Sequence, residues 1–237
     1  FRIGGQTQAF RIDVNGGSSQ AIDLGEVLDI ARVQQRLNYL GFPPALSVSA
    51  ADLSALDKAP PRLEVDGILG PNTRAALRLF QSVLDSSGES RPVEGSESGT
   101  PDARTVAALS SATAPRWQAY PGLTILERYA SSEVIAALRE ADRLVRTDPG
   151  YQYTGGGVQI SALSAVDGVS SGLAAVANQS VRPASTATAS HQSGMDANLA
   201  LPTTQANQLK LLRALVAGAG SGLQVRQLVV SDAALAT

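Results

Sequence analysis

The residue types best suited to chemistry gather around the only histidine of the chain. His191 stands in the run Ser190–Pro202, SHQSGMDANLALP, with Asp196 and Asn198 beside it and Arg182 shortly upstream. Imidazole nitrogens and carboxylate oxygens are ligands of catalytic zinc, which generally takes three from the protein and keeps one position open for water. By itself, a single histidine is more typical of a structural or surface residue. The chain has no cysteine, which excludes thiolate ligands and disulfides.

The run around His191 resembles the first zinc motif of the zinc peptidases that cut peptidoglycan stem peptides. That group contains D-Ala-D-Ala carboxypeptidases and penicillin-insensitive murein endopeptidases. The resemblance implies that His191 binds zinc, that Gly194 lets the backbone turn, and that Arg182 helps to bind substrate. In that group an aspartate seven positions after the histidine is the second ligand, but this chain has Asn198 there, and an amide oxygen is a poorer partner for a divalent cation. Asp196, on the same side of an expected strand, is the alternative ligand.

Two helices and three short strands are expected to position this motif. Apolar residues at helical spacing predict helices over 131–145 and 205–216. The second helix is expected to bury Leu209, Leu212 and Leu215 or Val216. Alternation predicts a strand over 158–160 and an apolar run one over 225–230, and residues 197–200 of the histidine motif are expected to share a sheet with them. We therefore expect an α/β domain built on an antiparallel sheet, with His191 at the edge of a strand.

Three interpretations of residues 131–237 stay open. The resemblance implies a further histidine ligand and a catalytic base on a later strand, which this chain does not contain. The domain is then a piece of a full-length zinc endopeptidase, a degenerate peptidase domain that only binds wall peptides, or an inactive structural module of a phage-tail-like or injection particle. Because the chain offers one imidazole and no thiolate, we expect zinc to be weakly bound or absent, and endopeptidase activity to be missing from this chain.

The N-terminal half has the clearest helical patterns. A turn at Val65-Asp66-Gly67 leads into a helix from about Thr73, and residues 31–41 form an earlier helix that ends at Gly41. The apolar stripes of the two helices are Val33, Leu37 and Leu40, then Ala76, Leu77 and Phe80. Their polar residues are expected to point away from these stripes: Gln34, Gln35, Arg36 and Asn38, then Arg74, Arg78 and Gln81.

Together these helices resemble the small three-helix peptidoglycan-binding domain of bacterial and phage cell-wall enzymes, over about residues 29–84. The shared pattern is V-Q-x-x-L-x-x-L-G followed by V-D-G-x-x-G-x-x-T-x-x-A-L-x-x-F-Q. The resemblance implies peptidoglycan binding, and we expect a shallow groove in which helix N–H groups and an arginine meet stem-peptide carboxylates. The candidate binding residues are Asp66, Gly67, Asn72, Thr73 and Arg74. For Asp66, Gly67 and Thr73 we favour the alternative that they only form the turn and the helix cap.

Two stretches depart from this pattern or echo it. The link over 42–62 is longer than that family usually has, and residues 49–56 are expected to add a helical turn. Further along, the first turn and helix are echoed by Val93, Glu94, Gly95, Pro101, Thr105, Ala108 and Leu109. We interpret the echo as an elaboration of the first domain rather than a second copy, because no second V-Q-x-x-L helix precedes it.

These observations predict an α+β protein. It comprises an extended arm over 1–25, a peptidoglycan-binding-like helical domain over 26–115, a connector over 116–130 and a murein-peptidase-like domain over 131–237. The connector holds the only tryptophan, Trp117, which we interpret as a packing anchor between domains in preference to a platform for sugar stacking.

Composition limits the partners of the protein. A net charge of −2 without a dense basic run argues against nucleic acid. No apolar run approaches the roughly 20 residues of a membrane span. The two resemblances imply an extracytoplasmic location, in the periplasm, in the cell wall or on a particle. The expected partner is peptidoglycan, and in the particle interpretation also the other subunits.

Overall fold

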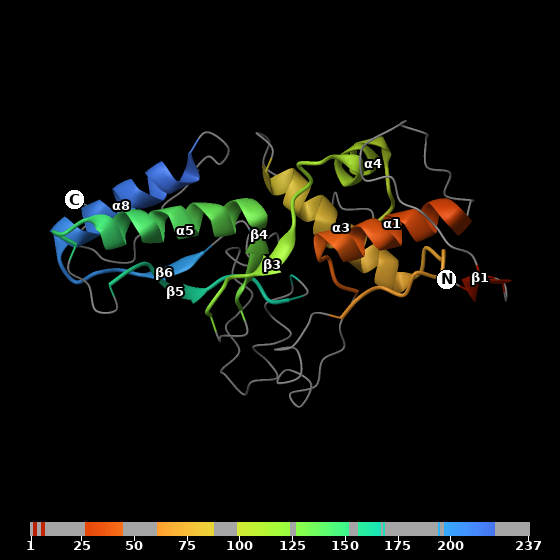
Figure 1. The fold of residues 1–237 in the computed structure, drawn as a ribbon, viewed down its shortest axis with the longest axis horizontal. Coiled ribbons are helices and arrows are strands. Elements are labelled where there is room, and N and C mark those ends of the chain that lie inside the picture. The colour runs from red at the N-terminus through yellow and green to blue at the C-terminus, as the bar shows by residue number, and fades with distance from the viewer. Residues whose placement is uncertain are drawn as a thin grey trace, which may run out of the picture.

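Five helices and three two-stranded antiparallel sheets lie within the described residues, which confirms the predicted α+β class. The computed structural model describes residues 2–3, 6–7, 27–44, 61–87, 99–123, 127–151, 156–166, 168, 194 and 197–220. In chain order the elements are β1 (Arg2–Ile3), β2 (Gln6–Thr7), α1 (Val27–Leu40), α3 (Pro71–Ser87), α4 (Ala103–Ser110), β3 (Trp117–Ala119), β4 (Tyr129–Ser131), α5 (Ser132–Thr147), β5 (Gln159–Ala162), β6 (Asn198–Ala200) and α8 (Gln205–Ala219). Figure 1 shows α1, α3 and α4 at one end and the α5–α8 pair at the other, with β3 and β4 between them.

The helices of the N-terminal half bury the predicted stripes. Gly41, with a φ of +89°, follows the last residue of α1, as the sequence predicted. The helix expected from about Thr73 begins two residues earlier, at Pro71, which is well suited to a first helical position. All six stripe residues are buried, and the rings of Phe42 and Phe80 meet edge to face with centroids 5.1 Å apart.

Trp117 at the start of β3 joins this helical core to the rest of the chain. Its side chain is 3% exposed and stacks between Phe42 and Tyr129, with ring centroids 6.2 and 6.5 Å away. The indole Nε1 donates a hydrogen bond of 2.7 Å to the carbonyl oxygen of Val166. Trp117 is therefore a buried packing residue, and its ring is not available to stack on a sugar.

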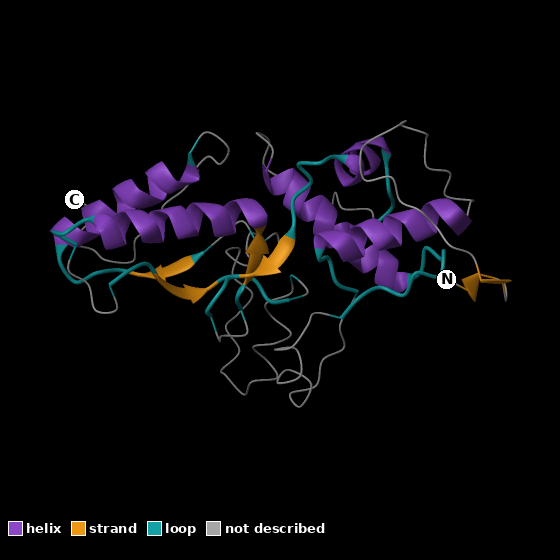
Figure 2. Cartoon of the chain, viewed as in Figure 1, coloured by secondary structure: helices purple, strands orange, loops and turns teal. Residues whose placement is uncertain are grey.

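The α5–α8 pair lies along the β5–β6 ribbon (Figure 2). The helix predicted over 131–145 is α5, and Ser131 is its N-cap residue. β5 and β6 pair antiparallel, with Ile160 opposite Leu199 and a bulge before Ala162. This confirms the pairing of the first two predicted strands, whereas residues 225–230 lie outside the described part of the chain.

The expected buried face of α8 is only partly correct, since Leu215 packs against the apolar clusters of this half. Leu209 and Val216 are 45% and 56% exposed, while the buried residues of this helix are Asn207, Gln208, Leu211 and Ala214. α8 approaches α5 through small residues, so that a Cβ at Gly218 would lie only 2.5 Å from the carbonyl oxygen of Ala137. Leucines occur on several sides of α8, and the need for close approach selects the side that carries alanine and glycine.

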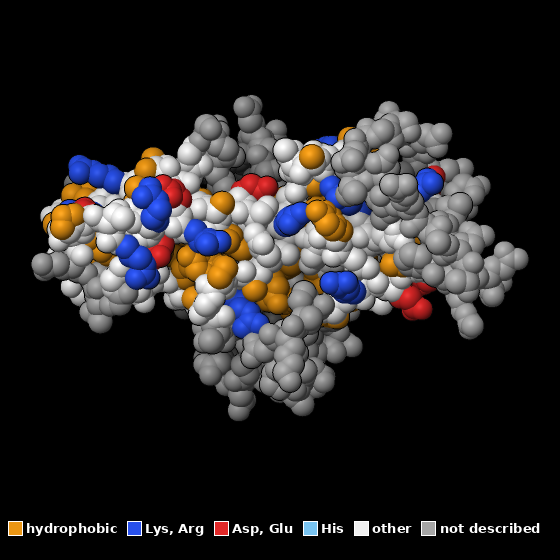
Figure 3. Space-filling model, viewed as in Figure 1, with side chains coloured by type: hydrophobic (Ala, Val, Ile, Leu, Met, Phe, Trp, Pro, Cys, Tyr) orange, Lys and Arg blue, Asp and Glu red, His pale blue; other side chains and the backbone are white. Residues whose placement is uncertain are grey.

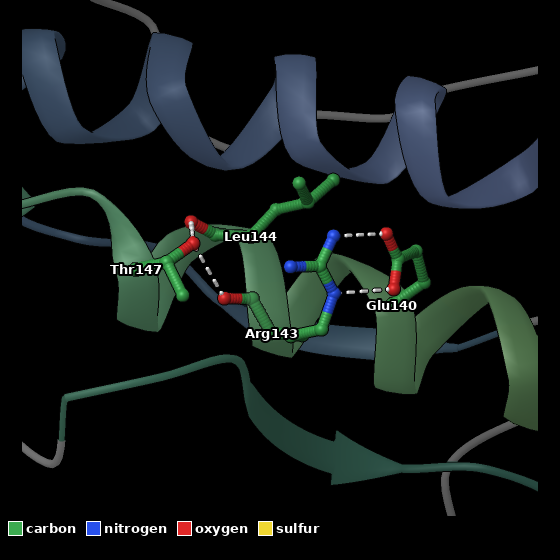
Figure 4. A network of polar contacts seen from close by, with 4 residues as sticks. All are labelled: Glu140, Arg143, Leu144 and Thr147. Carbon is green, nitrogen blue, oxygen red and sulfur yellow. Dashed lines mark hydrogen bonds and ion pairs between the residues drawn. The ribbon is translucent and has the colours of Figure 1, made fainter.

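Polar contacts on the surface of α5 stabilise the helix locally. Arg143 donates to both carboxylate oxygens of Glu140 at 2.6 and 2.8 Å, and the Thr147 hydroxyl donates to the carbonyl oxygens of Arg143 and Leu144, each at 3.0 Å (Figure 4). Such exposed helical pairs contribute little to stability.

Some predictions fall on residues outside the described ranges. These include the helical turn over 49–56 and most of the arm over 1–25, of which the structure describes the β1–β2 pair, with Arg2 opposite Thr7. Among the described helices, none is long and apolar enough to cross a membrane.

Candidate functional site

Gln34 of α1 holds together the turn and helix that carry the predicted peptidoglycan-binding residues. Its side-chain Oε1 accepts a hydrogen bond of 2.9 Å from the backbone N–H of Gly67. Its Nε2 donates to the Thr73 hydroxyl and to the carbonyl oxygen of Ile68, both at 3.0 Å. Gln34 and Thr73 are 1% and 3% exposed, so these bonds are shielded from water and satisfy an otherwise costly buried amide. We call Gln34, Gly67, Ile68 and Thr73 the first network.

Asp66 completes the turn at the first network. Its Oδ1 accepts hydrogen bonds from Gln34 Nε2 at 2.7 Å and from the backbone N–H of Ile68 at 2.9 Å. Gly67 has a φ of +74°, a conformation that favours glycine. Asp66 and Gly67 thus have the turn role favoured from the sequence. Thr73 is the third residue of α3, and its hydroxyl donates to the carbonyl oxygen of Ile68 at 3.1 Å. The backbone N–H groups of Gly67 and Ile68 are used inside the protein, which leaves fewer donors for a ligand than the sequence suggested.

Asn72 and Arg74 are the other predicted binding residues at this turn. Asn72 is exposed at the start of α3, and Arg74 is half-buried. Arg74 lies against a second turn, because a Cβ added at Gly99 would come within 2.9 Å of its carbonyl oxygen. Next to them, Ile68 is 62% exposed. The loop therefore presents the Asn72 amide and the apolar side chains of Ile68 and Pro71 to solvent, with the arginine partly covered.

A second network repeats the first one helix further along the chain. Gln81 of α3 accepts from the backbone N–H of Gly99 at 3.0 Å and donates to the carbonyl oxygen of Thr100 at 2.8 Å and to the Thr105 hydroxyl at 3.1 Å. Gly99 has a φ of +67°. The carbonyl oxygen lies one residue after Gly99 and the threonine six residues after it. Ile68 and Thr73 have the same spacing from Gly67. We call Gln81, Gly99, Thr100 and Thr105 the second network.

The second network corrects the interpretation of the echo. The residue that corresponds to Gly67 is Gly99 and not Gly95, and the spacing of six residues from the glycine to the threonine is then the same in both copies. A helix with the required glutamine also precedes it. Gln34 of α1 bonds to Thr73 at the N-terminal end of α3, and Gln81 in the C-terminal part of α3 bonds to Thr105. Two overlapping helix–turn–helix units therefore share α3.

Gln34 and Gln81 are the structurally important residues that the sequence reasoning missed. Both were expected to point away from the apolar stripes, yet they are 1% and 7% exposed. A signal was present, since each directly follows a buried apolar residue, Val33 or Phe80, and so lies at the border of a stripe. Asn38 was misplaced in the same way, because its side-chain amide exchanges two hydrogen bonds of 2.8 and 2.9 Å with the backbone of Leu63.

The histidine motif is described only in part. His191, Asp196 and Arg182 lie outside the described residues. Gly194 has a φ of +62°, as a turn at this position requires, and a Cβ there would lie 2.3 Å from the Trp117 ring. Its carbonyl oxygen accepts a hydrogen bond of 3.2 Å from the backbone N–H of Ser131. The glycine of the motif therefore packs directly on the tryptophan that joins the two halves.

Asn198 is the one proposed zinc ligand whose position is described. It is an exposed residue of β6, and its backbone oxygen accepts a hydrogen bond of 3.0 Å from the Ser161 hydroxyl. Within the described ranges, no three His, Asp, Glu or Cys side chains lie close enough together to hold a metal ion. With one imidazole and no thiolate in the chain, the donor set does not fit a tight catalytic zinc site.

Comparison with known proteins gives no match to a protein-family model, to a curated protein or to a solved structure. The two resemblances therefore depend on the motifs of this chain alone, and its function has to be argued from the geometry.

Proposed function

We propose that this protein is a bacterial cell-wall protein whose helical half binds peptidoglycan and whose α/β half is a murein-peptidase-like unit. The observation that carries the proposal is the first network. Asp66, Gly67 and Thr73 come from the turn–helix pattern and Gln34 from the preceding helix pattern, and all four meet in one set of hydrogen bonds. These bonds join the two helical patterns of the resemblance into one unit. The proposed location is outside the cytoplasm, where peptidoglycan is found.

Co-sedimentation with purified peptidoglycan sacculi tests this function, and the whole chain is the right sample. A fragment that stopped at residue 115 would lose Trp117 and Tyr129 from the core that contains Phe42. We expect the intact protein to pellet with sacculi and to stay in solution after the sacculi are digested to soluble fragments. A protein that remains in the supernatant at all protein and sacculus concentrations would rule out peptidoglycan binding.

The α/β half is proposed to act without a catalytic zinc in this chain. Two or three mostly oxygen ligands around one imidazole should hold zinc weakly, since neutral amide oxygen offsets none of the metal charge. We expect metal analysis after gel filtration to find far less than one zinc per chain, and no release of stem peptides from sacculi. Stoichiometric zinc would contradict this. Asn198→Asp should raise zinc affinity, and a His-x-His strand added after Thr237 should raise it further. If zinc stays unbound with both changes, the peptidase resemblance is wrong.

A second candidate function is a non-catalytic part of a phage-tail-like or injection particle. The exposed Leu209 and Val216, two turns apart on α8, favour it, because apolar side chains on one helix face are suited to contact another subunit. Sedimentation velocity distinguishes the candidates, since the particle component should self-associate with rising concentration and a monomeric wall-binding protein should not.

A further inference from the structure

Tyr39, Arg36 and Arg116 form an exposed cationic aromatic site where α1 ends and β3 begins. The Tyr39 side chain is 57% exposed, and the guanidinium carbons of both arginines lie 5.0 Å from the centroid of its ring. Arg116 Nη2 also donates a hydrogen bond of 2.8 Å to the Tyr39 hydroxyl. Figure 3 shows basic side chains beside hydrophobic ones over this junction.

The site is held in place by the surrounding backbone. Arg36 donates from Nε to the carbonyl oxygen of Leu109 and from Nη2 to that of Ser111, the latter at 2.7 Å. Partial burial lowers the pKa of Arg36, and the nearby charge of Arg116 lowers it further, against an opposing effect of Tyr39. A guanidinium remains protonated under such shifts, so the ring and two positive charges stay fixed at the surface. A fixed set of donors loses little entropy when a ligand binds.

Neither arginine of this site is neutralised within the described part of the chain. The ion pairs found there use other basic residues, namely Arg32, Arg143, Arg146 and Lys210. Two guanidinium groups that share one aromatic ring repel each other, and an anion bound beside both would relieve the repulsion. Guanidinium groups bind carboxylates through short, charge-assisted hydrogen bonds. An aromatic face beside them offers contact area to a sugar ring or an aliphatic side chain.

We propose that Tyr39, Arg36 and Arg116 bind a carboxylate of a peptidoglycan stem peptide, with the Tyr39 ring supporting the group attached to it. This inference rests on the proposed function and places the ligand contact at Tyr39 in preference to the predicted loop. At the predicted loop, the N–H groups of Gly67 and Ile68 are already bonded inside the protein. The Tyr39 site instead presents two guanidinium groups and an exposed aromatic side chain together.

The test is a titration of the full ¹⁵N-labelled chain with a soluble disaccharide–peptide fragment of peptidoglycan that has free carboxylates. We expect chemical-shift changes at the Tyr39 amide and the Arg116 Nε–H, and about tenfold weaker binding for Arg116→Gln and for Tyr39→Ala. Arg213→Gln is the matched control, since it removes an exposed arginine from α8 and should leave affinity unchanged. The same fragment with amidated carboxylates should bind about tenfold less tightly. Arg36 is left intact because it also bonds to the backbone after α4.

The sacculus experiment, run beside the titration, separates the two claims. If wild type and both variants pellet equally and bind the fragment with equal affinity, the Tyr39 site is wrong and peptidoglycan binding stands. If the fragment binds at Tyr39 through its carboxylate but sacculi are not bound, the site stands as a peptide-carboxylate site and the proposed function is wrong. If neither ligand binds wild type, both are wrong. Unchanged thermal unfolding of both variants confirms that affinity losses do not come from misfolding.

Discussion

The first and second networks have the same hydrogen-bond pattern but different neighbouring carboxylates. In both, a buried glutamine accepts from a glycine N–H and donates to a carbonyl oxygen and to a threonine hydroxyl. In the first network the carboxylate is Asp66, which bonds directly to Gln34. In the second it is Asp102, which caps α4 by accepting from the Thr105 N–H at 2.7 Å and so bonds to the threonine rather than to the glutamine. Glutamine, glycine and threonine are therefore the common structural unit, and the carboxylate varies.

The two turns also differ in what surrounds them. The first exposes Ile68 and Asn72, whereas Gly99 of the second packs on the backbone of Arg74 and the side chain of Arg78. The turn of the second unit therefore covers part of α3, whereas the turn of the first unit is exposed to solvent. The same hydrogen-bond pattern can therefore form an internal turn or a turn that is open to solvent.

The largest expected effect follows from removing the glutamines. Gln34→Leu should lower the free energy of unfolding by about 3 kcal/mol and Gln81→Leu by about 2 kcal/mol, because buried groups lose their partners. The larger loss at Gln34 reflects its additional bond to Asp66. Gln35→Leu, the adjacent half-buried glutamine, is the control and should change stability by less than about 0.5 kcal/mol. Urea denaturation measures all three, and equal losses at Gln34 and Gln81 would show that Asp66 adds nothing.

A smaller effect is expected from the glycines. Gly99→Ala should cost about 2 kcal/mol, because it combines an unfavourable positive φ with a contact to the Arg74 backbone. Gly122 has a φ of +84° and no atom within 4 Å of its would-be Cβ, so Gly122→Ala isolates the backbone strain at about 1 kcal/mol. Thermal unfolding compares the two variants. If they lose the same stability, the packing of the second turn on α3 is unimportant.

Much of the fold was predictable because apolar periodicity reports directly on burial. The helices that became α1, α3 and α5 were expected from their stripes, and the β5–β6 pairing from alternation. Periodicity was only partly right at α8, where Leu215 packs inward but Leu209 and Val216 do not, and the contact with α5 selected Ala214 and Gly218. A stripe predicts which residues are apolar, and it cannot predict which apolar side a neighbouring helix will approach most closely.

The candidate sites were less predictable because they depend on contacts between distant residues. Polarity placed Gln34 and Gln81 on the outside, yet their partners are 39 and 24 residues away in sequence. The Tyr39 site joins residues 77 positions apart, and nothing in either local sequence indicates the contact. Motif resemblance found the turn at Asp66 and Gly67 but not its connection to α1, which is tertiary.

The smallest expected effect is a pH dependence of stability due to Asp102, which bonds to Thr105 of the second network. Hydrogen bonds from the Thr105 side chain and backbone N–H lower the pKa of Asp102 below its ordinary value of 3.8. A depressed pKa in the folded state means that the stabilisation is fully present above that ordinary value and is lost as pH falls through the folded-state pKa. Asp102→Asn keeps a good N-cap residue but cannot titrate. Stability of wild type should therefore fall more steeply than that of Asp102→Asn as the pH drops from about 5 towards 2. Urea denaturation at a series of pH values gives the difference between the two stability curves. The contributions of all other carboxylates cancel in this difference. Curves that stay parallel over this range would mean that the cap acts through hydrogen-bond geometry and not through its charge.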